Sequence, residues 1–180
     1  KPKRGHQIRG PHIALQNYKQ QDVHSCGFVA ALTVARYYDP EVSAVDVLKA
    51  VRPLVNSGVD RHNLKASLEK LGVEPVFRAD LTVQDLRDYV RAGVPVIVSV
   101  WPDEWMSDHW TVVQGFDEKY VYLTNHKRLP VDLFRAEWSD MDMRSAGGSA
   151  EGLVCHPKAG PAALSVIIEG DRLRLTAEIL

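Results

Sequence analysis

The chain has 180 residues, of which 45% are hydrophobic, and its 22 Lys and Arg residues nearly balance its 23 Asp and Glu residues. This length is enough for one domain with a sizeable buried core. The formal net charge of −1 indicates neither a nucleic-acid nor a membrane-surface partner, and no apolar stretch reaches the roughly 18 residues of a membrane span.

The first residues of the chain, 1–9, are basic but lack interleaved aromatic residues. We therefore expect a solvated tail within an N-terminal extension over residues 1–15. The sequence contains no signal-peptide core and does not begin with Met. We therefore expect a processed product or an excised domain. We favour a cytoplasmic location over secretion, because a reactive thiol suits that compartment.

The first predicted helix begins at Cys26, because apolar residues follow at helical spacing as far as Tyr38. Asp22 and Ser25 are candidate N-cap residues. A thiol in the first helical turn has a lowered pKa, since the unpaired amides and the macrodipole favour the thiolate. Cys26 is therefore a candidate nucleophile, and its alternative interpretation is that of a small buried apolar side chain.

Gln20 precedes Cys26 by six residues. Its side-chain amide is a candidate donor to a developing oxyanion, alongside the backbone N–H of Cys26 itself. Acyl transfer needs such a pair of donors. Because Gln16 and Gln21 lie close by in a polar stretch, an ordinary surface glutamine is the alternative interpretation.

Further helices and strands are predicted over the middle of the chain. Ser43 and Thr82 are N-cap residues, and Gly72 and Gly93 follow two of the helices as C′ residues. The predicted helices run from Ser43 to near Pro53, over 61–71 and over 83–92, and the predicted strands lie at 73–77 and 95–100.

Strands dominate the chain after residue 108. A hairpin is predicted from strands at 109–116 and 120–124, with its turn at 117–119. A second hairpin joins 164–169 to 172–177 through Gly170-Asp171. Residues 145–149 are expected to be a flexible connector. A helical half thus precedes a sheet half, which predicts an α+β domain.

His109 is the candidate base among seven histidines, because it begins a strand after the polar loop 103–108. Its alternative role is that of a packing residue beside Trp110, which with Trp101 and Trp105 is a candidate apolar wall. The residue that orients the imidazole is predicted to be Asn125. His109 lies eight residues before Asp117 and Asn125 eight after it, so an antiparallel hairpin would bring their ends together. Asp117, the other candidate, is expected in the turn.

The second cysteine, Cys155, allows two competing interpretations. A disulfide between Cys26 and Cys155 would remove the nucleophile. A zinc site built from His24, Cys26, Cys155 and His156 has poor ligand spacing. We therefore expect no metal and no cofactor.

These residues together carry a family resemblance. The runs Gln20–Gly27 and His109–Asp117 resemble papain-like cysteine peptidases of the C39 type, which include the peptidases that remove double-glycine leaders from bacteriocin precursors. The segments similar to that family are 58–64, 93–98, 131–134 and 137–138, and the resemblance covers residues 16–142.

The resemblance implies the papain-like fold, with the nucleophile at a helix N-terminus packed on an antiparallel sheet that carries the histidine. It makes Cys26 the nucleophile, His109 the base and acid, Asn125 the orienting residue and Gln20 the oxyanion donor. Family members usually carry Asp-Pro where this chain has Asn125-His126, and an asparagine supplies less charge to an imidazolium.

The resemblance also suggests the organisation and partners of the chain. A peptidase domain is expected at 16–145, followed by a C-terminal extension at 146–180, and the partner is a peptide or protein substrate. Two other functions use the same fold: an acyltransferase or peptide-tailoring cyclase, in which an amine or hydroxyl replaces water, and a non-catalytic peptide-binding module.

Overall fold

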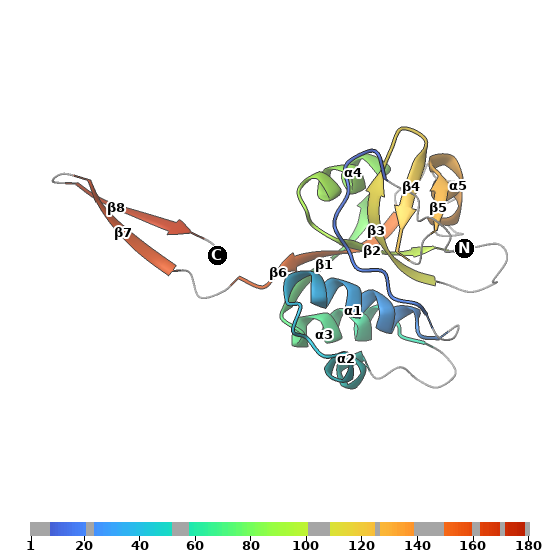
Figure 1. Cartoon of the computed structure of the whole chain (residues 1–180), viewed down its shortest axis with the longest axis horizontal. Coiled ribbons are helices and arrows are strands. Elements are labelled where there is room, and N and C mark those ends of the chain that lie inside the picture. The colour runs from blue at the N-terminus through green and yellow to red at the C-terminus, as the bar shows by residue number, and fades with distance from the viewer. Residues whose placement is uncertain are drawn as a thin grey trace, which may run out of the picture.

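The computed structural model describes residues 8–20, 24–51, 58–100, 109–124, 127–138, 150–159, 163–169 and 172–178, the last two as backbone. It is an α+β arrangement in which helices precede a six-stranded antiparallel sheet, as predicted. Helices α1, α2 and α3 gather on one side of this sheet, and α4 and α5 lie on the other (Figure 1).

Helix α1, Cys26–Tyr38, is the most buried helix of the domain. Every residue from Cys26 to Ala35 except Phe28 is buried. Small residues, Gly27, Ala30 and Ala31 among them, let neighbouring elements approach its backbone closely. Ser25 occupies the N-cap position, as predicted, but its side chain makes no capping hydrogen bond.

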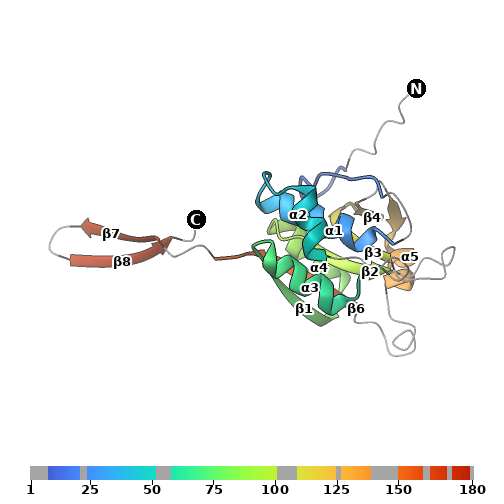
Figure 2. The same ribbon diagram turned by 90° about the horizontal axis from the view of Figure 1, so that it is seen from below.

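Helices α2, Ala44–Val51, and α3, Arg61–Lys70, pack beside α1 (Figure 2). The Ser43 hydroxyl caps α2 by accepting from the Asp46 N–H at 3.1 Å. Asp60 caps α3, and Gly72, with φ of +80°, follows its end in the left-handed conformation that glycine adopts without strain. The predicted helices and their caps are therefore confirmed here.

The sheet has the strand order β1-β6-β2-β3-β4-β5. Its strands are β1 (Val73–Leu81), β2 (Val96–Val100), β3 (His109–Phe116), β4 (Tyr120–Leu123), β5 (Arg128–Pro130) and β6 (Ala150–Pro157). The strands predicted at 95–100, 109–116 and 120–124 are confirmed. The strand predicted at 73–77 is longer than expected, because its pairing with β6 continues to Leu81.

Strand β6 lies between β1 and β2, although the sequence analysis assigned it to a C-terminal extension. Gly152 allows β6 to fit between its two neighbours, since a Cβ at this residue would lie 2.9 Å from Leu81 Cδ1 and 3.1 Å from Val96 Cγ1. Residues 150–157 thus complete the six-stranded sheet.

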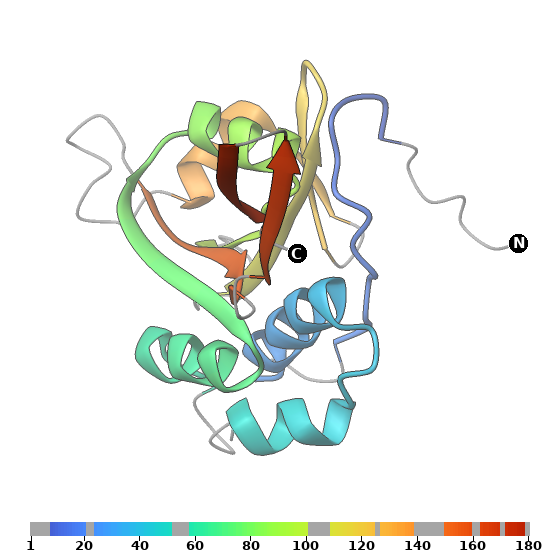
Figure 3. The ribbon, with the colours of Figure 1, turned by 90° about the vertical axis from the view of Figure 1, so that its left-hand side faces the viewer.

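The N-terminal segment also joins the sheet, where it lies along β3 (Figure 3). Phe116 N donates to Pro11 O at 3.0 Å, and Ile13 N donates to Gln114 O at 2.8 Å. Ile13 and Leu15 are buried. Part of the expected extension at 1–15 is therefore bound to the domain.

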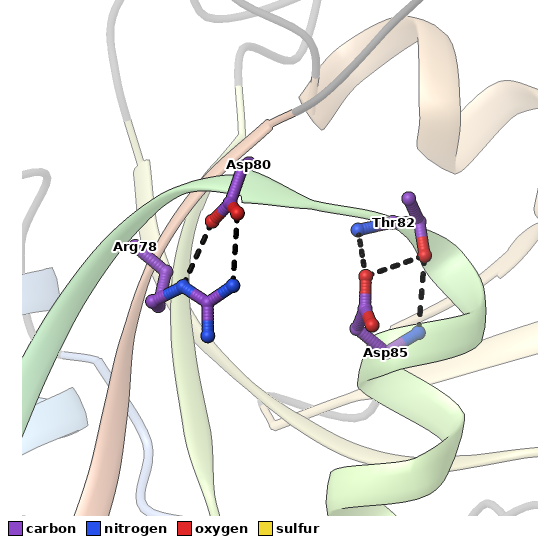
Figure 4. A network of polar contacts seen from close by, with 4 residues as sticks. All are labelled: Arg78, Asp80, Thr82 and Asp85. Atoms are coloured by element: carbon purple, nitrogen blue, oxygen red, sulfur yellow. Dashed lines mark hydrogen bonds and ion pairs between the residues drawn. The ribbon is translucent and has the colours of Figure 1, made fainter.

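Helices α4, Val83–Arg91, and α5, Val131–Trp138, cover the other side of the sheet. The sequence analysis did not predict α5 or β5. A capping box begins α4: Thr82 Oγ1 accepts from Asp85 N at 3.1 Å, and Thr82 N donates to Asp85 Oδ2 at 2.7 Å. Figure 4 shows this capping box beside the ion pair of Arg78 and Asp80, which lies near the C-terminal end of β1.

Strands β7, Ala163–Glu169, and β8, Arg172–Glu178, form the predicted second hairpin as a separate two-stranded sheet. The expected connector at 145–149 lies outside the described residues. Within the described ranges, the helices are all too short or too polar to cross a lipid bilayer.

The capping box leads to a prediction for stability. Thr82→Ala removes the side-chain acceptor of the Asp85 N–H, so we expect the free energy of unfolding to fall by about 1 kcal/mol. Thr82→Ser keeps the hydroxyl and should retain most of that stability. Urea denaturation of the three proteins measures the difference, and equal midpoints for Thr82→Ala and the parent would contradict this assignment.

Candidate active site

Cys26 is the first residue of α1 and lies at the positive end of its macrodipole. Its thiol forms no disulfide, and the residue is only 5% exposed. The first intrahelical bond of this end is Val29 N to Ser25 O, and no acidic residue occupies the first turn. The helix end therefore keeps the potential that stabilises a thiolate.

His109 is the first residue of β3, where it pairs with Val100 of β2. It is 3% exposed. Helix α1 packs against β3 (Figure 1), so the nucleophile and base candidates come from two elements in direct contact.

The contact between these elements involves the residues next to the two candidates. A Cβ added to Gly27 would lie 3.0 Å from Val59 Cβ and 3.5 Å from Trp110 Cδ1. Cys26 precedes Gly27, and His109 precedes Trp110. The structure thus brings the first turn of α1 and the start of β3 to one place, as a thiol and imidazole pair requires.

Burial is the larger of two causes that lower the pKa of His109 to about 4, and the positive charge of Lys127 is the second. The imidazole is therefore neutral at neutral pH in the folded protein. A neutral imidazole can accept the proton of a thiol, so this state is that of a general base before reaction. The sequence analysis did not identify Lys127.

Gln20 is half-buried in the N-terminal segment, which lies along β3 before the chain reaches α1. Asn125 lies outside the described residues, as do Asp22, Trp101 and Trp105. The predicted roles of Gln20 and Asn125 therefore stay predictions.

Asp117 lies in the turn between β3 and β4, at the opposite end of β3 from His109. Its carboxylate accepts from the N–H groups of Lys119 and Tyr120, both at 2.8 Å, and from the Tyr122 hydroxyl. About 25 Å of strand separates it from His109. The structure therefore removes Asp117 as the residue that orients His109.

The register of the β3–β4 hairpin differs from the symmetric pairing that the sequence analysis assumed. Val113 pairs with Leu123, whereas Gly115 pairs with Tyr122, so a β-bulge shifts the register at Gln114. Strand β4 ends at Leu123, and the chain then turns back to pair with it as β5, where Leu123 N donates to Lys127 O at 2.9 Å. Asn125 lies outside the described residues, so its predicted contact with His109 stays a prediction.

Cys155 lies at the other end of α1 from Cys26. The Tyr38 hydroxyl donates to Cys155 O at 2.6 Å, and α1 separates Tyr38 from Cys26 by about 18 Å. A disulfide needs Cα atoms within about 7 Å, so the two thiols cannot pair. Burial raises the pKa of Cys155 to about 12, which makes it an inert thiol.

The same separation divides the hypothetical zinc ligands, because His24 accompanies Cys26 while His156 accompanies Cys155. Among the described residues, no three His, Cys, Asp or Glu side chains gather as metal ligands.

A groove of about 550 Å³ lies at the turn end of the β3–β4 hairpin, lined in part by Arg9, Arg87 and Lys119. Arg87 stacks over Phe116 there, 4.9 Å from its ring centroid. This groove is remote from His109, so it is separate from the thiol and imidazole pair.

Comparison with known sequences identifies one family. The sequence model of the peptidase C39 family matches residues 15–143. A search of curated proteins gives no match.

Solved structures with the same fold are peptidase domains. The peptidase domain of Streptococcus ComA, a bifunctional ABC transporter of a quorum-sensing pathway, is 20% identical with a TM-score of 0.62, over 81% of this chain and 99% of that one. A C39-like peptidase from Bacillus anthracis is 15% identical with a TM-score of 0.62, over 82% and 98%. At these identities the likeness shows the fold, which confirms the papain-like architecture expected from the sequence.

A third structure contains a bound peptide. It is a double-glycine-motif protease from an AMS/PCAT transporter in complex with the leader peptide. It is 17% identical with a TM-score of 0.61, over 83% of this chain and 95% of that one.

The electrostatics of His109 lead to a prediction. The Cys26→Ser substitution removes the thiol, so that the imidazole can be titrated without it. In this protein we expect NMR titration to give a pKa for His109 well below 6.5. Lys127→Gln should raise this pKa without restoring it fully, because burial is the larger cause. Lys119→Gln removes the same charge at the far end of the hairpin and should leave it unchanged. An equal His109 pKa with and without Lys127 would contradict the assignment.

The same shift couples stability to pH. The unfolded chain binds the proton of His109 near pH 6.5, whereas the folded protein binds it only near pH 4. The free energy of unfolding should therefore fall as the pH drops through this window. Lys127→Gln should bring the folded and unfolded pKa values of His109 closer together, so the free energy of unfolding should fall less in that variant. Urea denaturation at several pH values measures this difference.

Proposed function

The chain belongs to the peptidase C39 family, and from this membership we propose that it is a cysteine peptidase with Cys26 as nucleophile and His109 as base and acid. The observation that supports this most is the contact of the two elements that begin with these residues, α1 and β3. Both residues are buried where that contact forms.

The first step of the proposed reaction is attack on a peptide carbonyl. His109, neutral before reaction, takes the proton of Cys26 Sγ, and the sulfur forms a bond to the carbonyl carbon. The positive end of α1 stabilises the thiolate as it forms. The carbonyl oxygen becomes an oxyanion, which the backbone N–H of Cys26 and the side-chain amide of Gln20 would bind.

The second step breaks the peptide bond. The imidazolium of His109 donates its proton to the nitrogen of the leaving amine, and the tetrahedral intermediate collapses to a thioester on Cys26. Water, deprotonated by His109, then attacks the thioester, and the thiol is regenerated as the acid product leaves. In this scheme Asn125 orients the imidazole by accepting its other N–H.

The low pKa of His109 makes these assignments chemically specific. Lys127 and burial both oppose a positive imidazole in the resting protein, so an imidazolium forms only when a thiolate or an oxyanion accompanies it. The charge that develops during attack therefore gains stabilisation that the resting state lacks, which is the condition for catalysis.

We propose that the substrate is a precursor peptide with a leader that ends in a double glycine. The bound leader peptide in the AMS/PCAT protease supports this assignment through the shared fold. Glycine at the two positions before the scissile bond would allow the peptide to approach a thiol that is only 5% exposed.

The proposed activity is tested with a synthetic peptide that carries Gly-Gly before the scissile bond. We expect cleavage after the second glycine by the parent protein. Cys26→Ala should abolish cleavage, and Cys155→Ser, which alters the inert thiol, should retain it. Mass spectrometry of the products measures the cut and its position.

The same experiment separates the alternative functions. Added hydroxylamine competes with water for a thioester, so an acyltransferase would give mainly the hydroxamate and a peptidase mainly the acid at low amine concentration. A protein that binds the peptide tightly without forming either product would be a non-catalytic module, and that result would refute the proposed peptidase.

A further inference from the structure

Trp110 connects the start of β3 to the chain that leads into α3. Its indole Nε1 donates to Val59 O at 2.7 Å, across 51 positions of sequence. Trp110 is only partly buried, and it pairs with Ser99 of β2 through its backbone. The indole therefore extends from a strand that the sheet holds in place.

The acceptor, Val59, lies between a turn residue and the residue that caps α3. Gly58 has φ of +66°, a conformation that favours glycine. Asp60 caps α3 by accepting from Asn63 N at 2.9 Å. Arg61 then forms an ion pair with Glu151 of β6. The α3 cap and this ion pair hold the residues that follow the Val59 carbonyl.

The first turn of α1 packs against the same residue, Val59, through Gly27. Gly27 has no side chain there, and a Cβ would approach Val59 Cβ to 3.0 Å. Trp110, Val59 and Gly27 therefore form one junction among β3, the start of α3 and α1, which we call the indole junction. Both proposed reacting residues border it: His109 precedes Trp110, and Cys26 precedes Gly27.

We propose that Trp110 is a positioning residue, whose hydrogen bond to Val59 O sets the separation of Cys26 and His109 and thereby the fraction of thiolate. This proposal rests on the proposed function. Its physical basis is that coupling between a thiol and an imidazole depends steeply on their distance, so a small displacement of β3 from α1 weakens proton transfer.

The position of His109 explains why the sheet alone is insufficient. His109 is the terminal residue of β3, and its partner Val100 is the terminal residue of β2. Strand ends fray more readily than strand centres. The side-chain hydrogen bond of Trp110, one residue inside β3, holds this end to Val59, which in turn packs against Gly27 in the first turn of α1.

The experiment is the rate of Cys26 alkylation by iodoacetamide as a function of pH, in the parent and in Trp110→Phe. Phenylalanine keeps an aromatic ring but cannot donate to Val59 O. We expect the apparent pKa of the Cys26 thiol to rise by about one unit, which makes alkylation about tenfold slower below that pKa.

Tyr37→Phe is the matched control. The Tyr37 hydroxyl also donates to a backbone carbonyl, Gly93 O at 2.9 Å, but in the last turn of α1, at the end opposite to Cys26. This variant loses the same kind of bond, so a general loss of stability would affect both proteins. We expect the Cys26 profile of Tyr37→Phe to match that of the parent.

A second variant changes the junction from its other side. Gly27→Ala keeps the indole but adds a methyl group that Val59 must accommodate. We expect it to raise the thiol pKa in the same direction as Trp110→Phe, and it serves as the test if Trp110→Phe does not fold.

The outcomes separate this proposal from the proposed function. An unchanged thiol pKa in Trp110→Phe, or in Gly27→Ala where the first does not fold, overturns the positioning role. Peptide cleavage by the parent protein is measured separately, so the peptidase can stand while the role of Trp110 fails. An equal shift in Tyr37→Phe would also overturn the proposal, because it would show a general response to lost stability.

Discussion

Close packing of the first turn of α1 against the start of β3 is the constraint on which the candidate site depends. Neither element supplies a reactive pair alone: the helix contributes a thiol at its positive end, and the strand contributes an imidazole at its terminus. Gly27 permits the approach because any larger side chain would meet Val59. The rest of the domain supports this contact, since β6 completes the sheet and the segment around Ile13 continues the pairing of β3.

Cys155, Cys26 and His109 are all buried, but their surroundings give them different chemistry. Cys155 is enclosed within the sheet, where burial alone keeps its thiol protonated. Cys26 is nearly as buried but lies at a helix N-terminus, where the field favours an anion. His109 is kept neutral by burial and by Lys127. The same dry environment thus makes one thiol inert and gives the other a base that is ready to accept its proton.

Local signals account for the parts of the fold that the sequence predicted. The caps at Ser43 and Thr82 and the terminal Gly72 act within a few residues, so helix limits could be read directly. Strand β6 was missed because its position depends on pairing with β1 and β2, which are distant in sequence. The bulge at Gln114 was missed for a related reason: Gln114 O accepts from Ile13 N, a contact about a hundred positions away that no local pattern encodes. Within the candidate site, the sequence predicted that Cys26 and His109 begin their elements. The bond of Trp110 to Val59 and the effect of Lys127 on His109 could not be predicted, because only folding brings these residues together.

The measurement that tests the coupling of Cys26 and His109 most directly is alkylation of Cys26 in the parent protein and in His109→Gln, from about pH 5 to about pH 9. Glutamine fills a similar volume but cannot accept a proton. The account predicts a thiolate that reacts below its ordinary pKa of about 8.5 in the parent and loses most of that reactivity without the imidazole. Equal rates in the two proteins across this range would contradict a nucleophile and base pair at the junction of α1 and β3.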